Sequence, residues 1–132
     1  MTKKITAITK YRPRIVLERT VQIEELARYI EGRTALNQGE IINVLIELNN
    51  AVREFALQGH SIAIRGLGIF RPGIRLDGRY RMHVRIDPGI RKALNVPAAF
   101  QGTVSNRDNI GKTRDDLVAM WNTTHPDDPV VE

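Results

Sequence analysis

The chain has 132 residues, a net charge of +5 and an isoelectric point near 10.0, a length that fits one domain with extensions. It contains no cysteine, which excludes disulfides and thiol chemistry. Its three histidines (His60, His83 and His125) are scattered, so neither a metal site nor another cofactor is expected. No apolar run approaches the roughly 20 residues of a membrane span, and the basic N-terminal residues lack the apolar core of a signal peptide.

Positive charge is concentrated in the middle of the chain. Residues 61–97 contain eight Lys or Arg and two Asp, whereas residues 106–132 contain three Lys or Arg and six acidic residues. A basic segment followed by an acidic tail is typical of a polyanion-binding module, with simple solubility as the alternative explanation.

The first third of the chain is predicted to form short strands and a short helix. Loose apolar alternation from Lys3 to Arg19 predicts one or two short strands. The helix is expected to begin at Thr20 or Gln22 and to end at Gly32, with its apolar residues on one stripe.

A longer helix is predicted from Asn37 to about Gln58. Asn37 is a favourable N-cap, Glu40 has capping-box spacing, and Gly59 suits the position after the helix. Apolar residues occupy more than one stripe of this helix, so we expect it to be buried on two sides. In so small a chain the second cover is expected to be a partner subunit, with the same domain as the alternative.

Two β-hairpins are expected next, the first around the turn residues Gly66 and Gly68. In the second, alternation places arginines on one face and apolar residues on the other. A three-residue loop, Asp77-Gly78-Arg79, keeps the faces separate and predicts Arg75 opposite Arg81 and Arg71 opposite Arg85. An odd-length loop is therefore expected, with a compensating bulge as the alternative. Because like charges opposite each other destabilise a ladder, this face favours an anion such as nucleic-acid phosphate. A solvated face with splayed arginines is the alternative.

The last third is predicted to contain two short helices. One follows Pro88 and ends before Pro97, and Thr113 is expected to cap the other, with a loop between them and a frayed end after them. The stretch NRDNIGKT has the Gly-Lys-Thr of a phosphate-binding loop but lacks the first glycine and a preceding buried strand, so no nucleotide site is expected.

The order of these elements resembles the HU/IHF family of bacterial histone-like DNA-binding proteins. The similar segments are IEELARYIEGRTALNQGEIINVLIELNNAVREFALQGHSIAIRGLGIFRPG and VRIDPGIRKALN. The resemblance covers residues 22–96 and implies an α+β fold with two N-terminal helices, a three-stranded antiparallel sheet with a short hairpin arm, and a C-terminal helix. Residues 1–21 are then an N-terminal strand extension, and residues 97–132 are a C-terminal extension with a short helix.

The resemblance also implies a function. The family's members are non-enzymatic, nucleoid-associated proteins of the cytoplasm that form intertwined homodimers and grip double-stranded DNA with two arms. The implied partners are therefore DNA and a second copy of the chain, with no membrane, cofactor or small-molecule substrate. The alternative is the same dimer serving as a protein-interaction scaffold without significant DNA binding.

The resemblance assigns roles to particular residues. The expected DNA contacts on the arm are Arg71, Arg75, Arg79, Arg81 and Arg85, with Arg65, Arg91 and Lys92 as secondary contacts. Lys3, Lys4 and Lys10 are candidates for nonspecific contacts, with solvated strand residues as the alternative. The expected core or dimer-interface residues are Leu45, Leu48, Val52, Phe55 and Phe70. The tip Asp77-Gly78-Arg79 lacks the family's Asn-Pro wedge, so we expect weak DNA bending.

Overall fold

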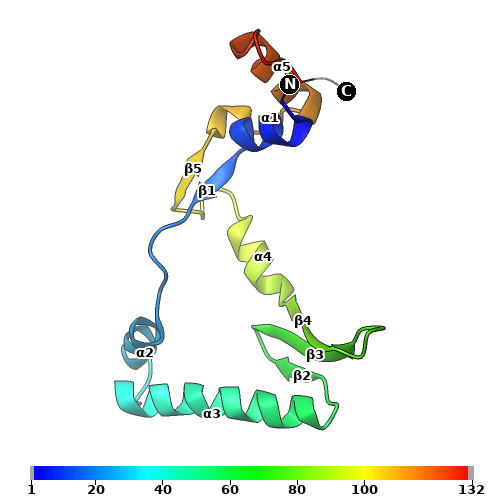
Figure 1. The fold of residues 1–132 in the computed structure, drawn as a ribbon. Helices are drawn as coiled ribbons and strands as arrows, with labels where there is room; N and C mark the ends of the chain where they lie inside the picture. The colour runs from blue at the N-terminus through cyan, green and yellow to red at the C-terminus, as the bar shows by residue number, and fades with distance from the viewer. Residues whose placement is uncertain (1, 131–132) are drawn as a thin grey trace. The chain divides into compact units, whose positions relative to one another are not determined.

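A computed structural model describes residues 2–130, which form two compact units (Figure 1). The central unit contains residues 19–100. The terminal unit combines both ends of the chain, and its described residues are 2–18 and 101–130. The two ends therefore fold together although more than 80 residues separate them in the sequence.

The central unit begins with two helices, α2 (Ile23–Glu31) and α3 (Gln38–Leu57). The predicted start of α3 is confirmed, because Asn37 Oδ1 accepts a hydrogen bond from Glu40 N at 2.9 Å and the Glu40 carboxylate accepts one from Asn37 N. Ala27 of α2 and Ile41 of α3 are the buried apolar side chains of this unit among the described residues.

The helix α3 is apolar over most of its circumference, as predicted, but the unit covers little of it. Ile41 is the one residue of the helix that is buried. Val44 is 59% exposed, Ile46 and Phe55 are each 48% exposed, and Leu57 is 85% exposed. The apolar surface of α3 is thus largely uncovered within a single chain.

A three-stranded antiparallel sheet follows, in the order β2 (Ile62–Ile64), β3 (Gly68–Ile74) and β4 (Tyr80–Ile86). Because β2 pairs only with residues 68–70, the rest of β3 pairs with β4 alone and forms a two-stranded ribbon, the arm (Figure 1). The turn before β3 requires Gly68, since a Cβ there would collide with the carbonyl oxygen of Arg85.

The arm loop has the predicted odd length but lies one residue earlier than predicted. Its three residues are Leu76, Asp77 and Gly78, and Arg75 N donates to the carbonyl oxygen of Arg79 at 2.9 Å across the base of the loop. Gly78 has a left-handed conformation with φ of +86°, as a type I turn closed by a glycine bulge requires. The fixed place of this glycine shifts the strand register by two residues from the predicted one.

After β4, Asp87 begins the helix α4 (Pro88–Leu94) by accepting a hydrogen bond from Gly89 N at 2.9 Å. This matches the predicted short helix after Pro88. Asp87 N also donates to the carbonyl oxygen of Leu67 at 2.8 Å, which joins the start of α4 to the turn between β2 and β3.

The terminal unit contains α1 (Lys4–Tyr11), β1 (Arg14–Val16), β5 (Thr103–Ser105), the 3-10 helix η1 (Arg107–Asn109) and α5 (Arg114–Thr124). Strands β1 and β5 pair antiparallel. One short strand at Arg14–Val16 agrees with the sequence, but the prediction that residues 4–11 extend as a strand is wrong. That segment is helical because Ala7 and Tyr11 lie on one helical face that packs against α5, a contact that short-range alternation does not reveal.

The helices α1 and α5 form the small core of this unit. Ala7, Leu117 and Trp121 are buried, and Tyr11 meets the Trp121 ring edge-on with centroids 6.4 Å apart. The expectation of a frayed end is wrong for residues 125–130, since Trp121 Nε1 donates to the carbonyl oxygen of Asp128 at 2.7 Å.

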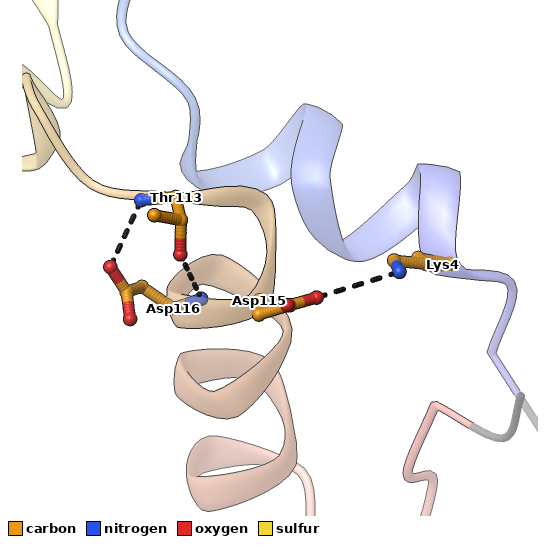
Figure 2. Close-up of polar contacts among 4 residues, drawn as sticks. All are labelled: Lys4, Thr113, Asp115 and Asp116. Carbon is orange, nitrogen blue, oxygen red and sulfur yellow. Dashed lines mark hydrogen bonds and ion pairs between the residues drawn. The ribbon is translucent and has the colours of Figure 1, made fainter.

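The predicted N-cap of α5 is confirmed (Figure 2). Thr113 Oγ1 accepts a hydrogen bond from Asp116 N at 3.2 Å, and Thr113 N donates to Asp116 Oδ2 at 2.9 Å. These bonds from Thr113 hold the pKa of the Asp116 carboxyl below its usual value. In the same turn, Lys4 Nζ of α1 lies 3.5 Å from Asp115 Oδ1, which links the two helices.

Candidate nucleic-acid interface

Strand alternation sorts the arm into an apolar face and a basic face, as the sequence predicted. The apolar face consists of cross-strand pairs such as Ile74 with Tyr80 and Pro72 with Met82. The remaining positions, which form the basic face, are Ile69, Arg71, Gly73, Arg81, His83 and Arg85, with Arg75 and Arg79 at the base of the loop.

The predicted opposition of arginines across the ladder is wrong for both pairs. Arg71 lies opposite His83, Arg81 lies opposite Gly73, and Arg85 lies opposite Ile69. Only Arg75 and Arg79 face each other, at the end of the ribbon. The observed register therefore staggers the guanidinium groups of the ribbon, which lessens their mutual repulsion and spreads positive charge along the face.

Gly73 makes room on this face for an imidazole ring. A Cβ at Gly73 would lie 3.3 Å from His83 Cδ2 and 3.4 Å from His83 Nε2, so the ring leans over the glycine backbone. Beside it, Ile69, Arg71, Val84 and Arg85 line a shallow hollow with His83. The sequence predictions did not include His83 among the contacts, although its alternation with Arg81 and Arg85 was a sufficient signal.

The arginines of the basic face are exposed and nearly free of acidic partners. Across residues 2–130, the one ion pair that involves them joins Arg79 Nε to Asp77 Oδ2 at 4.0 Å. Both side chains of that pair are solvent-exposed, so its stabilising effect is small. The arm therefore presents concentrated positive charge that the described part of the chain does not neutralise.

The secondary candidates lie near the base of the sheet. Arg65 is exposed in the turn after β2, and Arg91 and Lys92 are exposed in the last turn of α4. The hydrogen bond between Asp87 N and Leu67 O brings that turn and the start of α4 together.

The predicted core or interface residues are incompletely covered. Leu45, Leu48, Val52 and Phe70 are partly exposed, and Phe55 is 48% exposed. An apolar groove of about 950 Å³ runs between α3 and the apolar face of the arm. Its lining includes Val52, Ala56, Leu57, Pro72, Ile74, Tyr80 and Met82.

Other kinds of site have no counterpart in the part of the chain that the structure describes. Residues 2–130 contain no group of three or more His, Cys, Asp or Glu side chains arranged to hold a metal ion. No described helix is long and apolar enough to cross a membrane.

A helical hairpin, a three-stranded antiparallel sheet and a basic β-ribbon form an α+β arrangement compatible with an HU-like fold. The family model described as HU-HIG, an HU domain fused to a wHTH, Ig or glycine-rich motif, matches residues 2–87, more than half of the chain. The chain therefore belongs to this HU-like family, whose general function is architectural DNA binding without enzymatic activity. No curated protein and no solved structure shows significant similarity to this chain.

The matched range differs from the range of the sequence resemblance. It includes α1 and β1, which sequence reasoning treated as an extension outside the common core, and it ends at Asp87 before α4. The helix and strand at the N-terminus are thus part of what relates this chain to its family.

Proposed function

We propose that this chain is a homodimeric, nucleoid-associated protein of the bacterial cytoplasm that binds double-stranded DNA with little sequence preference and contributes to chromosome condensation. The observation that carries the proposal is the basic face of the arm, where Arg71, Arg81 and Arg85 are exposed and lack acidic partners among the described residues. Arginine binds phosphate with several parallel hydrogen bonds and displaces condensed cations from DNA. Arginine side chains also suit the minor groove of DNA, because the negative potential of a narrow minor groove attracts them.

The uncovered apolar surface supports a homodimer. The groove between α3 and the arm is lined by Val52, Ile74 and Met82, and in a single chain it opens to water. All seven residues of β4 are exposed. A chain of this size with so few buried side chains gains stability by covering such a surface, and a second copy offers a matching one.

The tip of the arm bears on DNA bending. Weak bending was expected because the predicted tip, Asp77-Gly78-Arg79, held no apolar side chain. The observed loop instead begins at Leu76, whose side chain is fully exposed at 111% of its reference area. Apolar side chains, leucine included, kink DNA by inserting between base steps. We therefore propose that Leu76 contacts bases at the arm tip and increases bending.

Titration of DNA binding against salt tests the proposed function. The test variant carries Arg71→Gln, Arg81→Gln and Arg85→Gln, and a charge-matched control carries Arg28→Gln, Arg33→Gln and Arg114→Gln, three exposed positions outside the arm. The parent should lose affinity steeply between about 50 and 200 mM salt, and the slope of log K against log salt should fall by about 0.9 for each phosphate contact removed. Only the arm variant should show the smaller slope.

Two results would contradict the proposal. One is an arm variant that binds duplex as tightly as the parent at every salt concentration. The other is a parent protein without measurable duplex affinity at low salt, which would favour a protein-interaction scaffold.

A further inference from the structure

The terminal unit carries a second concentration of positive charge that the arm does not account for. Its members are exposed cations at the junction of α1, β1 and the segment after β5. We name this group the corner cluster: Lys10, Arg12, Arg14 and Arg107.

Asparagine side chains fix the backbone that carries the first part of the corner cluster. Asn106 Nδ2 donates to the carbonyl oxygens of Lys10 and Arg12, at 2.8 and 3.0 Å. Asn109, which is buried, donates from Nδ2 to the carbonyl oxygen of Tyr11 at 2.7 Å. Three successive carbonyl groups are therefore held in place by side chains from the other end of the chain.

Arg14 is fixed by the same segment. It pairs with Ser105 in the β1–β5 ladder, and Arg14 Nε donates to Ser105 Oγ at 3.4 Å. Ser105 directly precedes Asn106 and lies two residues before Arg107. The four cations thus come from two short segments that hydrogen bonds join along their length.

The cations of the corner cluster have no acidic partner in the described residues. No ion pair within 4.0 Å involves any of them, and neighbouring Asp108 also forms none within residues 2–130. Lys10 Nζ instead lies 5.2 Å from the centre of the Trp121 ring and 3.4 Å from His125 Nε2.

Two acidic side chains of this unit are engaged elsewhere, at the start of α5 (Figure 2). Asp115 pairs with Lys4, and Asp116 caps the helix through Thr113. These two carboxylates are therefore not paired with the corner cluster.

We propose that the corner cluster is a second contact for the phosphate backbone of the duplex that the arm holds, an inference that rests on the proposed DNA-binding function. Cations on a fixed backbone lose less backbone freedom when they bind a polyanion than cations on a mobile segment do. Each phosphate that such an unpaired cation contacts releases condensed counterions from the DNA, and this release favours binding. Each unit of the chain then contributes its own cations to DNA binding.

The test compares two double variants of the full chain. Arg12→Gln with Arg107→Gln removes two charges from the corner cluster and spares Arg14, whose side chain bonds to Ser105. Arg33→Gln with Arg114→Gln removes two exposed charges outside the cluster. Affinity for a mixed-sequence duplex of about 30 base pairs is measured across the salt range, beside the arm variant.

The corner variant should bind more weakly at low salt and lower the salt slope by about 0.9 per lost contact, while the control keeps the parent's slope. Equal slopes for corner variant, control and parent would overturn the second contact and point to another anionic partner, such as an acidic protein segment. That outcome is distinct from failure of the proposed function, in which the arm variant itself keeps the parent's affinity. A parent that does not bind duplex at all would overturn both.

Discussion

Replacing Leu76 at the arm tip should weaken DNA binding without changing its salt dependence. Leu76 is fully exposed in the free protein, so Leu76→Ser removes no packing contact of the fold. Burying a leucine side chain between base steps contributes about 2 kcal/mol per arm relative to its exposure to water. Two arms in a dimer then contribute about 4 kcal/mol, and because the cost of unstacking the bases offsets part of this gain, the loss of affinity should be at most roughly 1,000-fold.

Fluorescence energy transfer between dyes at the two ends of a short duplex measures bending, and titration of the same duplex measures affinity. The parent should shorten the end-to-end distance, and Leu76→Ser should restore much of it while the slope of log K against log salt stays unchanged. Ile5→Ser is the matched control, because Ile5 is 70% exposed on α1 in the terminal unit. Equal bending and affinity for parent, control and Leu76→Ser would refute the role of the tip.

Three further predictions concern the dimer, the turn before β3 and the cap of α5. Val52→Glu puts a carboxylate into the groove that a second copy would cover, and burying this charge should weaken the dimer by about 3 kcal/mol per copy. Sedimentation equilibrium should show monomers for this variant and dimers for the control Asn43→Glu, which changes an exposed position on the same helix. Equal dimerisation of the two variants would argue against this interface. Gly68→Ala should lower the free energy of unfolding by about 3 kcal/mol because its Cβ would collide with the Arg85 carbonyl oxygen. The control Gly66→Ala, at a position with φ of +82° but open space around it, should lower the free energy of unfolding by about 1 kcal/mol. Urea titrations measure both values, and equal decreases would contradict the close approach at Gly68. Because the pKa of Asp116 is lowered, its ionised form stabilises the fold above the ordinary carboxyl pKa, and this stabilisation is lost as pH falls through the lowered pKa. The difference in the free energy of unfolding between the parent and Asp116→Asn should therefore shrink in acid. A constant difference from neutral to acidic pH would exclude the cap bonds as its cause.

Local sequence signals fixed several features of this protein in advance. The cap of α3 at Asn37 and the cap of α5 at Thr113 were predictable because each bond joins residues three positions apart. The sorting of the arm into two faces was predictable because alternation and an odd loop leave one consistent arrangement. The HU-like family was predictable because the order of helices and strands and the Gly-x-Gly turn lie within one continuous stretch.

The register of the arm could have been predicted from the sequence, but the predicted loop lies one residue too late, which shifts the register by two residues. A three-residue hairpin loop places its glycine last, in the left-handed conformation, which assigns the loop to Leu76-Asp77-Gly78. That shift puts Arg71 opposite His83, and it moves Leu76 from the apolar face to the tip.

Within the terminal unit, the helix α1 and the joining of the two chain ends depend on tertiary contacts. Residues 4–11 are short and weakly patterned, so their local preference does not choose between strand and helix. The helix forms because its face with Ala7 and Tyr11 packs against α5, where the Tyr11 ring meets Trp121. The corner cluster forms because Asn106 and Asn109 bind carbonyl groups more than 90 residues earlier. The sequence alone determines bonds between near neighbours, whereas contacts between the two ends of a chain depend on how the whole of it folds.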